Sequence, residues 1–162
     1  MDETESLAPK TDGLLVTASP DWEFVPAAIT ETGSRVWLIS PEVRDSFGET
    51  VVESWGSTEG DFSHTGLAGE FDEACASLPG WRPAVSHSWT EGVVDYTLVS
   101  GLAALGALEI ESTSVLALHS SSQTVSAHQV VVTTFADNRD RHVEALQHIR
   151  SASSTIAGWW YV

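Results

Sequence analysis

Histidine is the residue type in this sequence best suited to hold a metal ion or to move protons near neutral pH. A zinc site on a helix needs two histidines four residues apart, whereas His142 and His148 are six apart and cannot share one helix face. His119 and His128 flank the polar residues 120–123 and become cross-strand neighbours if that hairpin pairs symmetrically. Since nothing supplies a third ligand, we expect solvent-facing strand histidines and no metal. The six histidines are His64, His87, His119, His128, His142 and His148.

Nucleophilic and acid–base chemistry lack their usual sequence patterns. The serines stand in no Gly-x-Ser-x-Gly turn, and neither glycine-rich phosphate-binding pattern occurs. Lys10 is the only lysine, and Cys75, the only cysteine, is expected to be a small buried residue beside a helix. Glu109 and Glu111 share one face of a predicted strand, which we expect to be the solvent side of the sheet. We therefore assign no catalytic residue, no cofactor and no metal ligand, and an enzyme is not supported.

Aromatic residues are the remaining candidates for a site. The cluster Trp159, Trp160 and Tyr161 follows the predicted end of the last helix, and it is our candidate partner-binding site because tryptophan and tyrosine dominate binding hot spots. The alternative is that this cluster folds back and fastens the last helix to the sheet. Four other tryptophans lie on predicted strands, where they fill the core or line a pocket: Trp37, Trp55, Trp81 and Trp89.

Composition describes one acidic domain. The chain has 162 residues and a formal net charge of −16, which disfavours nucleic acids and anionic membrane surfaces as partners. The acidic excess lies in residues 1–111, either as a solvated surface or as a docking face for a basic partner. We divide the chain into an acidic flexible tail at 1–12 and a single domain at 13–162. Neither a signal peptide nor a membrane span is recognisable, so we expect a cytoplasmic protein.

The elements that must position these residues are mainly strands with two helices. A change to helical spacing predicts a helix at 65–78, and Pro41 is expected to end the strand that begins at residue 35. Asp137 is expected to cap a last helix of roughly twenty residues, with apolar positions running from Val143 to Ile156. The strands are expected at 13–19, 22–25, 35–40, 49–55, 81–89, 93–99, 107–119 and 124–135. This order predicts an α+β fold, an antiparallel sheet with packed helices.

Three short stretches carry a resemblance to a known fold. Pro20-Asp21-Trp22, Leu78-Pro79-Gly80-Trp81 and the run from Asp137 to His142 occur in an order that resembles the Mog1/PsbP-like fold, an α/β/α sandwich, and in particular actinobacterial LpqN-type proteins. The resemblance implies a non-enzymatic binding or assembly role and supplies no catalytic residue. LpqN-type members are commonly lipoproteins, and this sequence has no lipobox.

These observations support two functional hypotheses. The first is a non-enzymatic binding or assembly module that engages an unknown protein partner or a second copy of itself as a homodimer. The second is a small-ligand or enzymatic pocket between helix and sheet, lined by tryptophans. We favour the first because the motifs of catalysis are missing.

Overall fold

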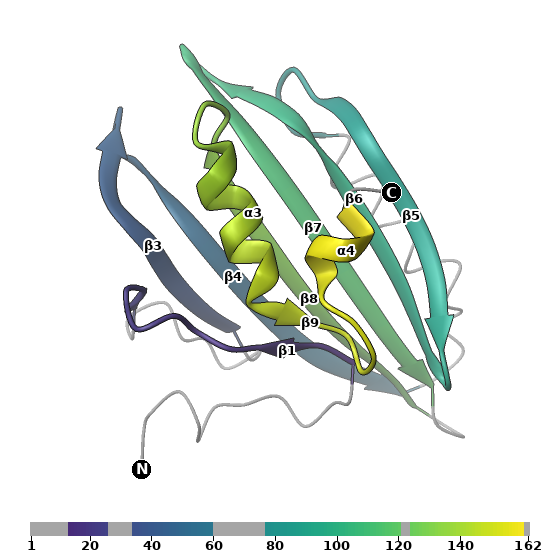
Figure 1. Cartoon of the computed structure of the whole chain (residues 1–162). Coiled ribbons are helices and arrows are strands. Elements are labelled where there is room, and N and C mark those ends of the chain that lie inside the picture. Colours follow the sequence, from purple (N-terminus) through teal and green to yellow (C-terminus); the bar gives the residue numbers. More distant parts are fainter. Residues whose placement is uncertain (1–12, 26–33, 60–76, 121–123, 161–162) are drawn as a thin grey trace.

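A seven-stranded antiparallel sheet forms the centre of the molecule (Figure 1). The computed structural model describes residues 13–25, 34–59, 77–120 and 124–160. The sheet order is β2-β3-β4-β8-β7-β6-β5, so the chain builds one half from β2 to β4, then returns along β5 to β8 and closes against β4. Its strands are β2 (Glu23–Phe24), β3 (Ser34–Arg44), β4 (Phe47–Glu59), β5 (Arg82–Glu91), β6 (Val94–Leu105), β7 (Leu108–Ser120) and β8 (Thr124–Phe135).

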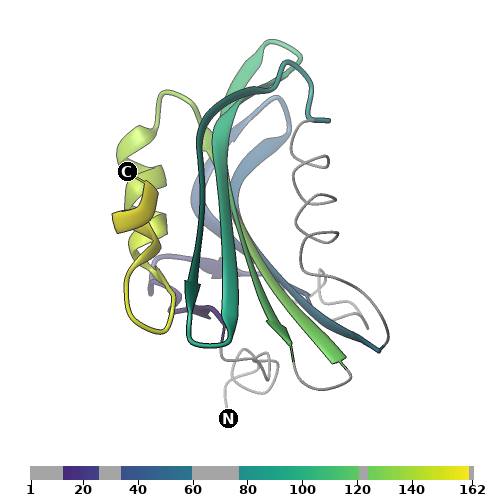
Figure 2. The ribbon, with the colours of Figure 1, turned by 90° about the vertical axis from the view of Figure 1, so that its right-hand side faces the viewer.

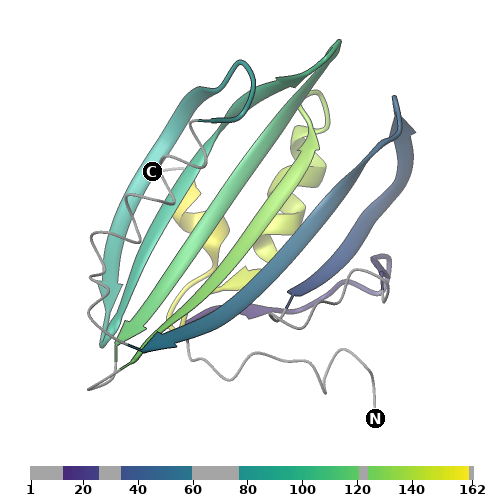
Figure 3. The same ribbon diagram turned by 180° about the vertical axis from the view of Figure 1, so that it is seen from behind.

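One face of this sheet carries a thin second layer (Figures 2 and 3). The layer holds helix α3 (Arg139–Gln147), the short helix α4 (Ile156–Trp160) and a two-stranded sheet of β1 (Leu15–Val16) and β9 (Ile149–Arg150). None of the described helices is long and apolar enough to cross a membrane.

The core lies between the sheet and this layer. Alternation along each strand directs every second side chain toward the layer, so the apolar members of that set become buried. Val51, Val115 and Val130 from the sheet are fully buried, as are Leu146 and Ile156 from the covering layer. Burial of a side chain of this size contributes about 1.5–3 kcal/mol, so this contact holds the layer in place.

The expected α+β fold with packed helices is wrong for the described residues, which are mostly in strands. Only two short helices, α3 and α4, occur among them, and neither is long enough to form a full helical layer. The helix expected at 65–78 lies almost entirely outside the described residues, which include only its last two positions.

The expected last helix is also shorter than its apolar spacing indicated. α3 ends at Gln147, and the chain then forms β9, which pairs with β1. The next residues, 151–155, are serines, an alanine and a threonine, and the Ser151 hydroxyl bonds to the backbone of Ser154 at 3.2 Å. Serine side chains that bond to nearby backbone compete with helical hydrogen bonds, which explains the break.

The strands lie where they were expected: β3 to β6 are longer than predicted, β7 and β8 have the predicted length, and β1 and β2 are reduced to two residues each. Gly92, at φ 61°, turns the chain between β5 and β6. β3 does not stop at Pro41 but continues to Arg44, because its register with β4 shifts between Leu38 and Val43. Such a bulge accommodates proline within a strand, since a residue there need not donate to the neighbouring strand.

Candidate functional site

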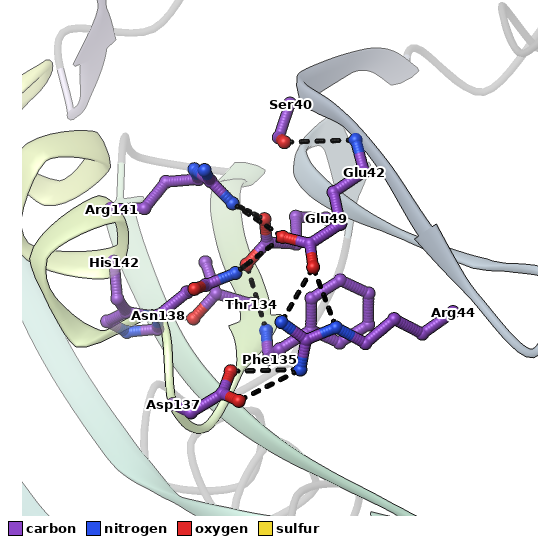
Figure 4. Close-up of polar contacts among 10 residues, drawn as sticks. All are labelled: Ser40, Glu42, Arg44, Glu49, Thr134, Phe135, Asp137, Asn138, Arg141 and His142. Atoms are coloured by element: carbon purple, nitrogen blue, oxygen red, sulfur yellow. Dashed lines mark hydrogen bonds and ion pairs between the residues drawn. The ribbon is translucent and has the colours of Figure 1, made fainter.

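Charged side chains gather where α3 begins and where the β3–β4 hairpin reaches over it (Figure 4). We name this group the α3 polar cluster. It joins β3 and β4 to the start of α3, segments about ninety residues apart in sequence. Its members are Glu42, Arg44, Glu49, Asp137, Asn138 and Arg141.

Glu49 is the buried centre of the α3 polar cluster. Its carboxylate is fully buried and accepts hydrogen bonds from the Phe135 backbone N–H at 3.0 Å and from the Asn138 amide at 3.2 Å. Arg141 forms an ion pair with its other oxygen. A buried carboxylate is costly unless donors compensate it, and here the donors come from both the end of β8 and from α3. Glu49 therefore fastens the helix to the sheet.

Arg44 and Asp137 form the exposed rim of the cluster. The Arg44 guanidinium bonds to Glu42 at 2.8 Å and to both carboxylate oxygens of Asp137 at 2.9 and 3.1 Å. It also lies 4.2 Å from the centre of the Phe135 ring, within the range of a cation–π contact. The Arg44 hydrogen bond lowers the pKa of Glu42, so this carboxylate remains ionised at neutral pH.

A shallow hollow of about 390 Å³ opens beside this rim. The Asp137 side chain is 69% exposed and pairs with Arg44, and the Glu109 side chain is 53% exposed and pairs with Arg82 at 2.5 Å. Both ion pairs are exposed to solvent and can be reached by a partner there. The hollow is lined by Arg44, Ala107, Leu108, Glu109, Ala136 and Asp137.

His142 is on the buried side of α3, where its ring contacts the hydroxyl groups of two threonines on the sheet. Its Nε2 is 2.7 Å from the Thr113 hydroxyl and its Nδ1 is 2.8 Å from the Thr134 hydroxyl, while Thr113 also bonds to Ser100 at 2.8 Å. Burial, and to a smaller extent the nearby charge of Arg139, lower the pKa of His142 to about 4. The imidazole is therefore neutral at physiological pH, with one nitrogen donating and the other accepting.

Glu111 is a second buried carboxylate, but it has fewer hydrogen-bond donors around it than Glu49. Its side chain is only 6% exposed, Arg139 is its ion-pair partner at 3.4 Å, and its Oε1 atom has no hydrogen-bond partner among the described residues. Burial raises the pKa of this carboxyl, and the charge of Arg139 offsets part of that rise.

A second buried charged group lies at the other end of the same face. Arg35 donates to Glu53 at 2.6 Å, and the His128 Nε2 donates to the second oxygen of Glu53, also at 2.6 Å. The Arg35 guanidinium lies 5.0 Å from the Trp37 ring and 5.6 Å from the Trp55 ring. These contacts join three strands, β3, β4 and β8, into one rigid unit.

The structure corrects several expectations about polar residues. His128 pairs with Ala117 across the hairpin and His119 with Ser126, so the two histidines are not directly opposite, and His128 is buried rather than solvent-facing. Glu109 is exposed as expected, but Glu111 is buried. Asp137 does not cap α3, because its carboxylate pairs with Arg44.

Asn138, and not Asp137, is the N-cap residue of α3. Its side-chain amide donates to Glu42 and Glu49, and its side chain makes no hydrogen bond to the helix backbone. Among the described residues, no group of three or more histidines, cysteines or acidic residues is placed to hold a metal ion.

The structure describes the side chains of some of the aromatic residues that the sequence suggested for a site, but not of all of them. Trp37 fills the core and Trp55 lines a hollow of about 240 Å³, as expected for tryptophans on strands. That hollow lies on the sheet face away from α3, since its other lining residues include Leu116 and Gln129. For the candidate partner-binding residues, the backbone of Trp159 and Trp160 forms the end of α4. Their side chains, with Tyr161, Cys75 and His64, lie outside what the structure describes.

Sequence reasoning missed the buried acids Glu49 and Glu53. Both share a strand face with Val51, which is fully buried. Two acids flanking a buried valine at spacing two were the available signal, because their side chains must then enter the core and find donors.

Comparison with known proteins identifies the fold but no sequence family. No protein-family model matches the chain, and no curated protein matches it in sequence. Among solved structures, LpqN of Mycobacterium tuberculosis, described as involved in cell envelope biogenesis, is similar with a TM-score of 0.67 and 16% identity. The match covers 84% of this chain and 80% of that one. The fold is LpqN-like.

A second solved structure supports the same architecture at greater distance. It is PA94 of Pseudomonas aeruginosa, described as a protein of unknown function and putative regulator, with a TM-score of 0.52 and 16% identity over 75% of this chain and 81% of that one. At such identities the LpqN-like fold is what the two proteins share with this chain.

Proposed function

We propose that this LpqN-like domain is a non-enzymatic binding module, and that the exposed rim of the α3 polar cluster contacts its partner. The observation that carries the proposal is the division of the cluster by exposure. Glu49 is buried and satisfied by three donors, whereas Asp137 and Glu109 remain accessible beside the hollow. The buried part is suited to hold the surface rigid, and the exposed part is suited to contact a partner.

The charge of the chain favours a basic partner. The net charge is −16, and two exposed carboxylates, Asp137 at the rim and Glu109 beside the hollow, each pair with an arginine that a basic partner could replace. Long-range attraction by such a field speeds association with a positively charged surface. The role given in the description of LpqN, cell envelope biogenesis, is consistent with a binding or assembly function, and the Mog1/PsbP-like assignment remains part of this proposal.

The buried histidine argues against a catalytic role for the same region. An efficient general acid or base has a pKa near the operating pH, whereas the pKa of His142 is lowered to about 4. Its two nitrogens are occupied by Thr113 and Thr134, so neither is directed at the hollow. A tryptophan-lined pocket between helix and sheet is not favoured, since the Trp55 hollow lies on the other face.

The test compares capture of proteins from a lysate of the source cell by three immobilised proteins: the native chain, Asp137→Lys and the matched control Glu144→Lys. Glu144 is an exposed acid on α3, so both variants make the same change of charge on the same helix region. We expect a partner that the native chain and Glu144→Lys retain and that Asp137→Lys loses. Identical captured sets for all three proteins would contradict the proposed contact surface.

The C-terminal aromatics remain a separate proposal for partner binding. Deleting residues 159–162 and comparing molar mass by light scattering tests whether Trp159, Trp160 and Tyr161 support self-association. An unchanged monomer–dimer balance would remove that role. The cytoplasmic location expected from the sequence likewise remains a prediction.

A further inference from the structure

Two buried titratable side chains lie under α3, and neither belongs to the α3 polar cluster. They are Glu111 on β7 and His142 on α3 itself. The hydroxyl groups of Thr113 and Thr134 contact the two ring nitrogens of His142. Thr134 lies directly opposite Glu111 on β8, and Thr113 follows Glu111 by two positions on β7, so both threonines share its strand face. Glu111 therefore lies beside the hydroxyl groups that hold the histidine.

The carboxylate of Glu111 is buried with too few donors. Its side chain is 6% exposed, and its Oε1 atom has no hydrogen-bond partner among the described residues. Its Oε2 atom is 3.4 Å from the guanidinium of Arg139, whereas a strong bond between two charged groups measures about 2.7–2.9 Å. Arg139 is itself 64% exposed, so water screens its attraction. Ionised Glu111 therefore destabilises the docked position of α3.

The other charged groups on this part of the sheet do not supply the missing donor. Glu109 shares the strand face of Glu111 on β7 and pairs with Arg82 of β5 at 2.5 Å. Glu49 on β4 takes its donors from α3 and from the end of β8. Ionised carboxylates only accept hydrogen bonds, and β6 and β8 place uncharged residues opposite Glu111. The titratable and charged groups around Glu111 are thus Arg139 and His142 on α3, Glu109 on β7, Arg82 on β5 and Glu49 on β4.

Burial changes the pKa values of the two groups in opposite directions. It raises the pKa of Glu111, and the charge of Arg139 offsets part of that rise. Burial, and to a smaller extent Arg139, lower the pKa of His142 to about 4. If α3 separates from the sheet, water reaches both groups, and their pKa values return toward about 4.3 for a glutamate and about 6.5 for a histidine.

These changes make the docking of α3 depend on pH in two opposing ways. The docked form binds the proton of Glu111 more tightly than the separated form, so this residue favours docking more strongly as the pH falls toward about 4.3. The separated form binds the proton of His142 more tightly, so this residue favours docking less as the pH falls below about 6.5. Between these two pH values the effects of the two residues therefore oppose each other.

We propose that Glu111 offsets the acid sensitivity of His142: when α3 separates from the sheet, the histidine takes up a proton and the carboxyl group releases one, so that α3 stays docked from neutral to mildly acidic pH. This role explains a buried carboxylate that is costly at neutral pH. It deepens the proposed binding function, on which its use rests, because the rim at Asp137 adjoins the start of α3 and stays in place only while the helix is docked.

The test measures how often α3 separates at two pH values. Hydrogen exchange of the amides of residues 142–147, corrected for the intrinsic rate at each pH, gives their protection in the native chain, in Glu111→Gln and in the matched control Glu144→Gln, which changes an exposed acid on the same helix. In Glu111→Gln only His142 of this pair responds, so its protection should fall about twentyfold from pH 7 to pH 5. The native chain and the control should lose less, by about threefold or more.

A second measurement keeps the test decisive if Glu111→Gln does not fold. The side-chain carboxyl carbon of Glu111, followed by NMR in the native chain, should titrate with a midpoint above about 4.3. A midpoint at or below that value, or equal losses of protection in the native chain and in folded Glu111→Gln, would overturn the proposal. No partner is present in either measurement, so failure here leaves the Asp137 capture test unaffected, and failure of that capture test leaves the offset between Glu111 and His142 intact.

Discussion

Some polar residues of this protein hold helix α3 against the sheet, and others remain exposed to solvent and to a partner. Glu49 and Arg141 join sheet and helix from inside, and Asp137, only a few residues from Arg141, is largely exposed. The difference follows from where the side chains point. The Glu49 side chain points from β4 into the core, while Asp137 lies in the turn before α3. Substitutions at these residues should therefore affect stability at Glu49 and binding at Asp137.

Glu49→Gln should lower the free energy of unfolding by about 2 kcal/mol, because the amide removes a buried charge from Arg141 and turns a donor toward other donors. Urea denaturation measures the loss. Glu144→Gln changes an exposed acid on α3 and serves as the control, with little effect expected. Equal stability of the two variants would show that Glu49 does not fasten α3.

His142 should make stability depend on pH. Its folded pKa, lowered to about 4, is below the usual value of 6.5, so the unfolded chain binds a proton more readily than the folded chain. The stability from this residue is therefore complete above about pH 6.5 and is lost as pH falls toward 4, by about 3 kcal/mol in all.

The variant His142→Gln cannot titrate and isolates this effect. Urea midpoints at pH 7 and at pH 4.5 should fall less for His142→Gln than for the native chain, since other acids contribute equally to both. Parallel losses in the two proteins would mean that His142 is not held neutral by the fold.

At the scale of elements, the sequence predicts where strands lie from the alternation of apolar and polar residues, but it does not predict which partners the polar residues find. The strands of the β5–β8 half could be predicted because each carries a long period-two pattern between clear turns. Glu111 could not be placed, because the same pattern marks it as polar whether its face meets solvent or α3. Burial of that face depends on where α3 packs, which is a tertiary contact.

The last helix shows a different limit. Ile149 and Ile156 are buried as a helix would require, but they reach the core from β9 and α4 rather than from one helix. Apolar spacing alone cannot distinguish these arrangements. The serines between them decide the outcome through local hydrogen bonds and through pairing of β9 with β1.

Gly101 fixes the packing of the β5–β6 hairpin. A methyl group there would lie 2.5 Å from the Arg82 carbonyl oxygen and 2.7 Å from the Trp81 ring. Gly101→Ala should therefore cost about 2–3 kcal/mol, because backbone and ring must both move. Gly56→Ala, in β4, meets no atom within 4 Å and should be nearly neutral. Thermal unfolding of both variants checks this, and similar melting temperatures would contradict the packing described for Trp81.

At the scale of the whole molecule, the net charge of −16 should make the binding of a basic partner depend on salt. A basic partner is attracted by this charge, so added salt should weaken its binding by screening the attraction. Capture measured from low to physiological ionic strength tests this direction. Capture that does not change as salt rises would contradict a contact based on charge.

The most direct test of the binding role places a buried and an exposed substitution side by side in the same capture experiment. His142→Gln removes the buried histidine of α3, and Asp137→Lys changes the accessible rim. The account predicts that His142→Gln still retains the partner and that Asp137→Lys loses it. The reverse result, with both variants folded, would contradict the account and would place the functional chemistry at the histidine.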